Sequence, residues 1–253
     1  MPSRGTLESG ARFHQPLDAS VSCHNRRVLV SHLYGGTRMY IPKQFEETDV
    51  GVLHQLILTH PLGALVTLTH HGLDANHIPL LVRAEPAPFG TLHGHIARAN
   101  PLWRDFSRDV EALVIFQGPD TYISPSWYPS KSEHRKVVPT WNYVVVHVHG
   151  YMRIIDDPVW MRAHLEELVT ACEAGRPVPW KVTDAPAEYI EKMVRAVVGL
   201  EIPIQRLIGK WKVSQNRTDR DREGVIEGLG NEGTERTLAM ASLVRRDHAA
   251  GNT

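Results

Sequence analysis

The sequence predicts a mainly β protein of the α+β class, built as an antiparallel barrel with peripheral helices. Between residues 63 and 155, about six short runs of branched and aromatic residues follow one another. Only short helical patterns separate these runs, whereas parallel strands need long crossover connections. Longer helical patterns come after residue 157, beyond most of the strands. The order of elements therefore favours an antiparallel barrel over a parallel sheet.

The first element is a helix that begins after Asp49, because an Asp side chain can accept hydrogen bonds from the free N–H groups of a first turn. Pro61 stops this helix. Asn100 and Pro101 are typical of the start of a second, short helix that reaches about residue 107. The predicted strands cover residues 63–69, 76–82, 91–96, 112–116, 121–124, 143–155 and 200–213.

Prolines and glycines mark the interruptions within this series. Pro79 argues for a sheet edge or a bulge, because proline cannot donate to a ladder. The tripeptide Gly118-Pro119-Asp120 predicts a turn between two separate strands.

The later part of the chain holds longer helices. Asp157 and Pro158 begin one that ends at Gly175, and Asp184 begins another that ends at Gly199. The polar tail contains two more helical patterns, over residues 222–229 and 235–246.

This order predicts three regions. Residues 1–38 have no lasting periodicity and are expected to form a disordered extension. Residues 39–213 form the barrel domain, with a helical segment inserted at about 157–199, and residues 214–253 form a helical tail.

Composition narrows the function. Twenty-eight Lys and Arg balance twenty-eight Asp and Glu, so no overall basic field favours nucleic acid or an anionic membrane. Two distant cysteines, Cys23 and Cys172, suit a reducing cytoplasm, and no apolar run is long enough to cross a membrane. We therefore expect a cytoplasmic protein.

The segment from Tyr122 to Lys131, followed by Val137–Tyr143, mixes hydroxyls, aromatic rings, prolines, an amide and a Lys. Aromatic rings offer flat apolar surfaces, and hydroxyls and cations offer donors to a phosphate. This mixture predicts the wall of a site for a planar, phosphorylated ligand. A proline-braced loop over the mouth of a barrel is the structural alternative.

The segment from His93 to Pro101 joins a strand to a helix start, where free N–H groups attract anions and Arg98 adds a bidentate donor. A phosphate would suit it, and an ordinary capped turn with a solvated Arg is the alternative. The strand end from Lys210 to Arg217 is also rich in donors, and could reach a ligand held by a second copy of the chain.

Fifteen histidines require metals to be considered. The pairs His93/His95 and His147/His149 each face one side of a strand, but no third ligand follows at a recognisable spacing. No metal site is predicted.

Taken together, these motifs resemble the PaiB family of FMN-binding proteins, described as negative transcriptional regulators. The resemblance runs from Met39 to about Leu229. It is carried by Met39–Phe45, Asn76–Leu80, Gly94–Pro101, Ser124–Lys131, Val138–Tyr143 and Gly209–Arg217.

The resemblance implies an FMN-binding split β-barrel and a homodimer with FMN in the cleft between subunits. By analogy with that wider fold, residues 94–100 would meet the flavin phosphate, and the strand 76–80 would lie along the isoalloxazine ring. The candidate FMN-binding residues are Asn76, His77, His95, Arg98, Asn100, Ser124, Ser126, Trp127, Tyr128, Lys131, Thr140, Trp141, Asn142, Gln215, Asn216 and Arg217.

The favoured function is a flavin-linked redox or ligand sensor connected to transcriptional repression. Direct DNA binding is disfavoured, because the chain has no recognition helix and no net positive charge. A flavin-dependent oxidoreductase and a haem-binding or haem-degrading split barrel remain as alternatives.

Overall fold

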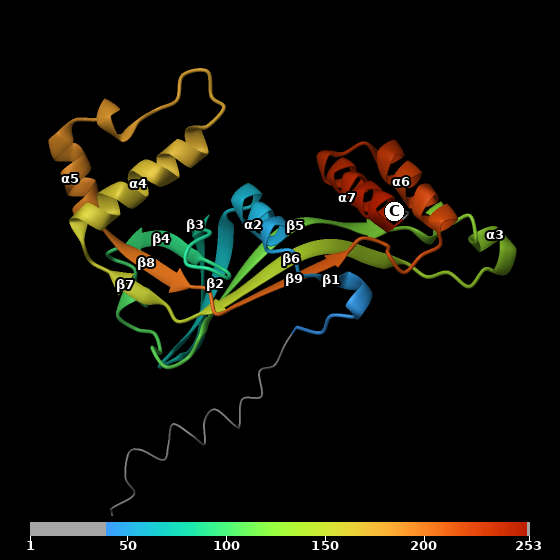
Figure 1. The fold of residues 1–253 in the computed structure, drawn as a ribbon, viewed down its shortest axis with the longest axis horizontal. Coiled ribbons are helices and arrows are strands. Elements are labelled where there is room, and N and C mark those ends of the chain that lie inside the picture. Colours follow the sequence, from blue (N-terminus) through green and yellow to red (C-terminus); the bar gives the residue numbers. More distant parts are fainter. Residues whose placement is uncertain (1–38, 252–253) are drawn as a thin grey trace, which may run out of the picture. The chain divides into compact units, whose positions relative to one another are not determined.

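An antiparallel sheet of nine strands forms the centre of the fold in the described part of the chain (Figure 1). The computed structural model describes residues 39–251, with side chains described as far as Asp247, and the predicted extension over residues 1–38 lies outside this range. The strands are β1 (Glu46–Glu47), β2 (Leu62–Thr69), β3 (Gly72–Arg83), β4 (Thr91–Ala97), β5 (Ala112–Ile123), β6 (Thr140–Gly150), β7 (Arg153–Ile155), β8 (Val197–Pro203) and β9 (Arg206–Lys212).

The spatial order of the strands is β1-β9-β6-β5-β2-β3-β4-β8-β7, and every pair is antiparallel. β3 joins the two parts of the sheet: its residues 72–79 pair with β2, and its residues 80–83 pair with β4. Pro79 lies at this junction and pairs on one side only, where its missing N–H leaves no gap in a ladder.

Two expected long strands each divide where the chain passes between the parts of the sheet. The run 143–155 becomes β6 and β7, and the run 200–213 becomes β8 and β9. The two breaks lie side by side, because the N–H of Gln205 donates to the carbonyl of His149 at 2.9 Å. A Cβ on Gly150 would lie 2.2 Å from the carbonyl oxygen of Pro203, so only glycine permits this close approach. Hydrophobic alternation does not reveal such corners, since it continues through them.

The expected turn at residues 118–120 is wrong. β5 continues through it from Ala112 to Ile123, with a shift of register against β6 between Gln117 and Asp120. A β-bulge places Pro119 outside the regular ladder, so the strand keeps its direction without the missing N–H.

Several helices differ from expectation at their ends. The helix after Asn100 is only a 3-10 turn, η2 (Pro101–Trp103). The helix expected from Asp184 to Gly199 is shorter at both ends. Asp184 ends the 3-10 helix η4 (Val182–Asp184), and α5 (Ala187–Arg195) begins after Pro186. Gly199 already belongs to β8. The remaining helices are η1 (Lys43–Phe45), α2 (Val50–Thr59), η3 (Pro125–Trp127), α3 (Lys131–His134), α4 (Pro158–Glu173), α6 (Asp219–Glu232) and α7 (Glu235–Gly251).

The helices cover two separate parts of the sheet. α4 and α5 pack beside β8, whereas α6 packs on η3 and α7 packs on β5 (Figure 1). Val225, Leu229 and Met240 of α6 and α7 belong to the main hydrophobic core together with Phe116 of β5. Burial of these side chains anchors the C-terminal helices to the sheet.

A smaller core lies between α4 and α5, built around Met161, Ile190 and Val194. The buried residues of α4, Met161 and His164, lie in its first half, and Cys172 near its end is exposed. None of the described helices is both long and apolar enough to cross a membrane.

Candidate flavin site

The first group of candidate residues lies where β3 and β4 approach η2, and we call it the asparagine turn (Asn76, His77, His95, Arg98 and Asn100). The side chain of Asn100 accepts a hydrogen bond from the N–H of Leu102 at 2.9 Å, which caps η2. Its amide donates to Oδ1 of Asn76 at 2.9 Å. The start of η2 is therefore joined to β3 through a pair of part-buried amides.

Arg98 holds the end of the inserted helical segment. Its guanidinium pairs with both carboxylate oxygens of Asp156, at 2.9 and 2.6 Å. The same side chain donates to the carbonyls of Arg195 at 2.8 Å and Val197 at 3.1 Å. The hydrogen bond to Asp156 and the charge of that carboxylate raise the pKa of Arg98. All four hydrogen bonds direct its donors toward protein atoms. The structure thus gives Arg98 a positioning task at the start of β8.

His95 belongs to a cluster of three histidines between β4 and α4. Nδ1 of His95 lies 3.2 Å from Nε2 of His164, and the ring of His164 stacks on Trp160 with centroids 5.2 Å apart. His93 completes the cluster, and its Nε2 lies 3.6 Å from a carboxylate oxygen of Glu201. Burial lowers the pKa of all three, and that of His164 falls to about 4. The cluster is therefore neutral at pH 7.

The second group is the aromatic loop, defined as Ser124–Lys131 with Thr140–Asn142 and Gln215–Arg217. Ser124 caps η3, and the Nζ of exposed Lys131 reaches Oγ of Ser126 at 3.4 Å. Trp127 lies against α6: a Cβ on Gly228 would come within 2.4 Å of its ring. Asp221 of α6 also accepts hydrogen bonds from the N–H of Ser130 at 3.1 Å and its hydroxyl at 2.8 Å. The loop is thus fastened to the C-terminal helices.

The strand end after β9 folds back onto this loop. The guanidinium of Arg217 lies 4.6 Å from the centroid of the Tyr128 ring, a cation–π distance. Burial raises the pKa of Tyr128, so its hydroxyl remains protonated at neutral pH. The side chain of Gln215 accepts from the N–H of Val213 at 2.8 Å and donates to the carbonyl of Trp211 at 2.6 Å, while Asn216 is exposed.

Trp141 presents a partly open aromatic face. It is 46% exposed, and its indole N–H donates to Asp120 at 2.7 Å. Tyr122 meets it edge-on with centroids 6.3 Å apart. Beneath it, Asn142 is fully buried: its amide donates to Oγ of Ser214 at 2.9 Å, and its Oδ1 has no hydrogen-bond partner among the described residues.

Sequence reasoning did not single out three residues that join this group. Lys212 donates to the hydroxyl of Thr140 and, at 2.6 Å, to the carbonyl of Trp141. Burial lowers the pKa of Lys212, and Lys210 and Arg217 lower it further. Asp120 and Asp221 anchor the loop from outside the quoted aromatic motif. The alternation of Lys210 and Lys212 along one strand was the available signal for Lys212.

The two groups are not brought together within one chain. No hydrogen bond in the described structure joins the aromatic loop to Asn76, His95, Arg98 or Asn100. In Figure 1, β4 lies toward one end of the sheet, whereas α3, which continues the aromatic loop, lies at the other. Each group is locally well built, and the sheet separates them.

The chemistry of the aromatic loop fits an FMN. Lys131, Lys212 and Arg217 supply cations for a phosphate, and Tyr122 and Trp141 are each 46% exposed, offering rings to a flat heterocycle. The unpartnered Oδ1 of Asn142 adds a buried acceptor.

Comparison with known proteins agrees with this chemistry. Residues 39–206 match the family model described as "Putative FMN-binding domain". An uncharacterized protein of Emericella nidulans is 34% identical over 242 residues, covering 82% of this chain and 96% of that protein. The protease synthase and sporulation protein PAI 2 of Bacillus subtilis is 32% identical over 206 residues, covering 81% and 96%.

Solved structures show the same fold at low identity. The flavocytochrome Anf3 of Azotobacter vinelandii matches with a TM-score of 0.50 and 15% identity, over 72% of this chain and 75% of that one. The FAD and heme binding protein of Mycobacterium smegmatis matches with a TM-score of 0.50 and 16% identity, over 70% and 78%. The fold is the expected antiparallel split barrel, its cofactor is FMN, and the chain belongs to the FMN-binding family that includes PAI 2 of Bacillus subtilis.

Proposed function

We propose that two copies of the chain form a homodimer and that each FMN lies between them. The asparagine turn of one subunit would face the aromatic loop of the partner. The observation that carries this proposal is the separation of the two groups along one sheet, although each has the chemistry of half a flavin site. A closed two-fold dimer would build two identical sites from these halves.

Each group has a role in this arrangement. Residues 94–100 would approach the phosphate, with Asn100 fixed by Asn76, and the strand through His77 would lie along the isoalloxazine ring. Arg98 would act by holding the turn in place. From the partner, Trp141 would cover the ring system, and Lys131 and the strand end 215–217 would supply donors.

Bound FMN supplies one- and two-electron redox chemistry, and the protein supplies orientation and electrostatics. We infer a sensor in which the redox state of the flavin, or a ligand beside it, biases the dimer and through it repression of transcription. The name of the Bacillus subtilis relative links that protein to protease synthesis and sporulation, which suits a regulatory output. We place this sensor in the cytoplasm, because two distant cysteines suit a reducing compartment.

A mixing experiment tests the shared site. Asn76→Ala impairs the asparagine turn, and Lys131→Ala impairs the aromatic loop; both residues have exposed or half-exposed side chains. Each variant alone should bind FMN weakly. After subunit exchange at equal concentrations, half of the dimers are mixed and each contains one intact site, so about one quarter of the sites should recover.

Recovery of tight FMN binding on mixing supports a shared site. If each variant binds weakly and the mixture recovers nothing, the flavin is held within one subunit and the arrangement is wrong. Steady oxidation of NADH or NADPH by the purified protein, with no response of any promoter to flavin state, would replace the sensor by an oxidoreductase.

A further inference from the structure

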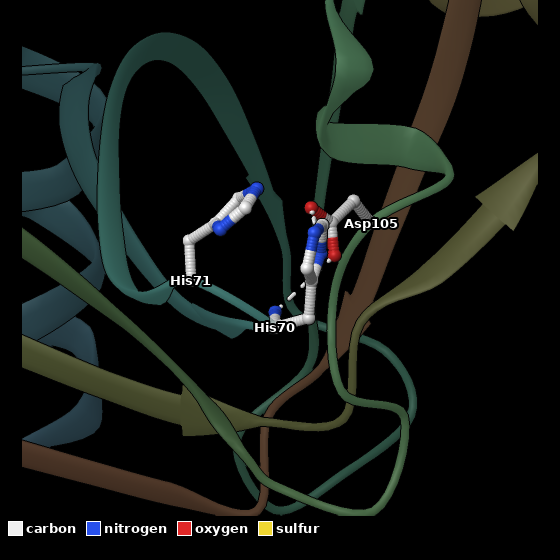
Figure 2. A group of neighbouring side chains, drawn as sticks. All are labelled: His70, His71 and Asp105. Atoms are coloured by element: carbon white, nitrogen blue, oxygen red, sulfur yellow. Dashed lines mark hydrogen bonds and ion pairs between the residues drawn. The ribbon is translucent and has the colours of Figure 1, made fainter.

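Two adjacent histidines, His70 and His71, occupy the tight turn between β2 and β3 and lie beside Asp105 (Figure 2). Nδ1 of His70 is 2.6 Å from a carboxylate oxygen of Asp105, and the two imidazole rings have centroids 3.7 Å apart. One potential ligand atom from each residue lies within 4.8 Å of the other two. In the part of the chain with described side chains, this is the only group of three or more His, Cys, Asp or Glu that meets that condition.

Backbone contacts hold the two segments that carry these side chains. The N–H of Ser107 donates to the carbonyl of Leu68 at 2.7 Å, which ties the segment after η2 to the end of β2. The N–H of His70 donates to the second oxygen of Asp105 at 3.3 Å. Within the turn, Oγ1 of Thr69 accepts from the N–H of His71 at 3.1 Å and donates to the carbonyl of Gly72 at 3.0 Å. The backbone positions of all three residues are thus fixed relative to one another.

We propose that His70, His71 and Asp105 bind a divalent transition metal ion, with Zn²⁺ as the best-suited ion. Two imidazoles and one carboxylate are a ligand set that Zn²⁺ accepts, whereas Mg²⁺ and Ca²⁺ prefer oxygen ligands alone. The metal would take the place of the proton between His70 and Asp105, because ligating groups bind in their deprotonated forms.

The geometry requires only small side-chain rotations. Tetrahedral Zn²⁺ at its usual bond lengths holds its ligand atoms about 3.4 Å apart. The 2.6 Å between Nδ1 of His70 and the Asp105 oxygen would have to widen to this spacing. The side chain of His70 is 67% exposed and that of Asp105 is 32% exposed, so both can rotate to reach it. Three protein ligands leave a fourth position for water or for a donor from another molecule.

Such an ion would clamp the β2–β3 turn to the segment that follows η2. The asparagine turn begins at the other end of η2, where Asn100 caps it. Metal binding would therefore stabilise the neighbourhood of the asparagine turn. The proposal itself does not depend on flavin binding, since none of the three residues belongs to the candidate flavin site.

Calorimetric titration of the chelator-treated full chain with ZnCl₂ tests this site, and the chain's many other histidines require a matched control. His71→Ala and Asp105→Asn each remove one ligand, whereas His60→Ala removes a half-exposed imidazole at the end of α2. The wild type and His60→Ala should each bind Zn²⁺ at one tight site. Zn²⁺ should also raise the melting temperature of both proteins.

His71→Ala and Asp105→Asn should each weaken that site on the order of tenfold or more and lose the rise in melting temperature. Circular dichroism checks that both variants fold, which is expected because His71 is exposed and Asp105 is half-buried outside the helices and strands. Zn²⁺ affinity equal to that of the wild type in either variant would overturn the proposal, as would the absence of a tight site in the wild type.

Discussion

Replacing His164 with glutamine tests whether the buried histidine cluster makes folding stability depend on pH. His164 is 1% exposed, and burial lowers its pKa from 6.5 to about 4, with smaller contributions from His95 and His93. The folded state therefore disfavours the proton that the unfolded state accepts. Stability from this group is present above pH 6.5 and is lost as the pH falls from about 6.5 toward 4.

The size of the effect follows from the two pKa values. A difference of about 2.5 between them corresponds to about 3 kcal/mol when the loss is complete, and to about 2 kcal/mol between pH 7 and pH 5. His93 and His95 act in the same direction, because burial lowers the pKa of each. Arg83 also lowers the pKa of His93, whereas Glu201 and Glu167 raise it and partly offset the loss.

Urea unfolding followed by tryptophan fluorescence at pH 7 and pH 5 measures this difference. His164→Gln keeps a side-chain amide that can donate to Nδ1 of His95, and it does not titrate. The variant should lose about 2 kcal/mol less than the wild type between the two pH values. His134→Gln, at an exposed position of α3, controls for the loss of one histidine. Equal losses in the wild type and His164→Gln would refute the reasoning.

Three further predictions concern the site and its supports. Gly228→Val should lower the free energy of unfolding by about 1–3 kcal/mol, because the valine side chain would overlap the ring of Trp127. Urea unfolding measures this loss, and an unchanged midpoint would show that the ring can move aside. Asp156→Asn should lower the melting temperature, because it weakens the pairing with Arg98. High salt should lower the melting temperature of the wild type more than that of the variant, and a smaller drop in the wild type would count against an ionic contribution. Lys131→Ala should weaken FMN binding, whereas riboflavin, which lacks the phosphate, should bind equally to variant and wild type. An equal loss of affinity for both ligands would show that Lys131 does not contact the phosphate.

Much of the fold could be predicted from local patterns. Asp49 caps α2 as expected, with its carboxylate accepting from the N–H groups of Gly51 and Val52. Asn100 likewise caps the turn that follows it. These features depend on residues close in sequence, and such interactions are the ones that sequence patterns describe.

The errors arose where tertiary contacts decide the structure. Pro119 sits in a bulge that exists only because β6 runs beside it, and Gly150 marks a corner only because Pro203 lies against it. Within the candidate site, the sequence likewise did not reveal the ion-pair partner of Arg98, because Asp156 lies 58 residues farther along the chain. The part that Arg98 plays in flavin binding stays a prediction.

The central claim is that this chain binds FMN as a dimer, and an FMN titration on a sizing column tests it most directly. The account predicts that the purified protein elutes at the mass of two chains and carries the visible absorption of bound flavin, either as isolated or after FMN is added. A protein that elutes as one chain and releases all added FMN would contradict it.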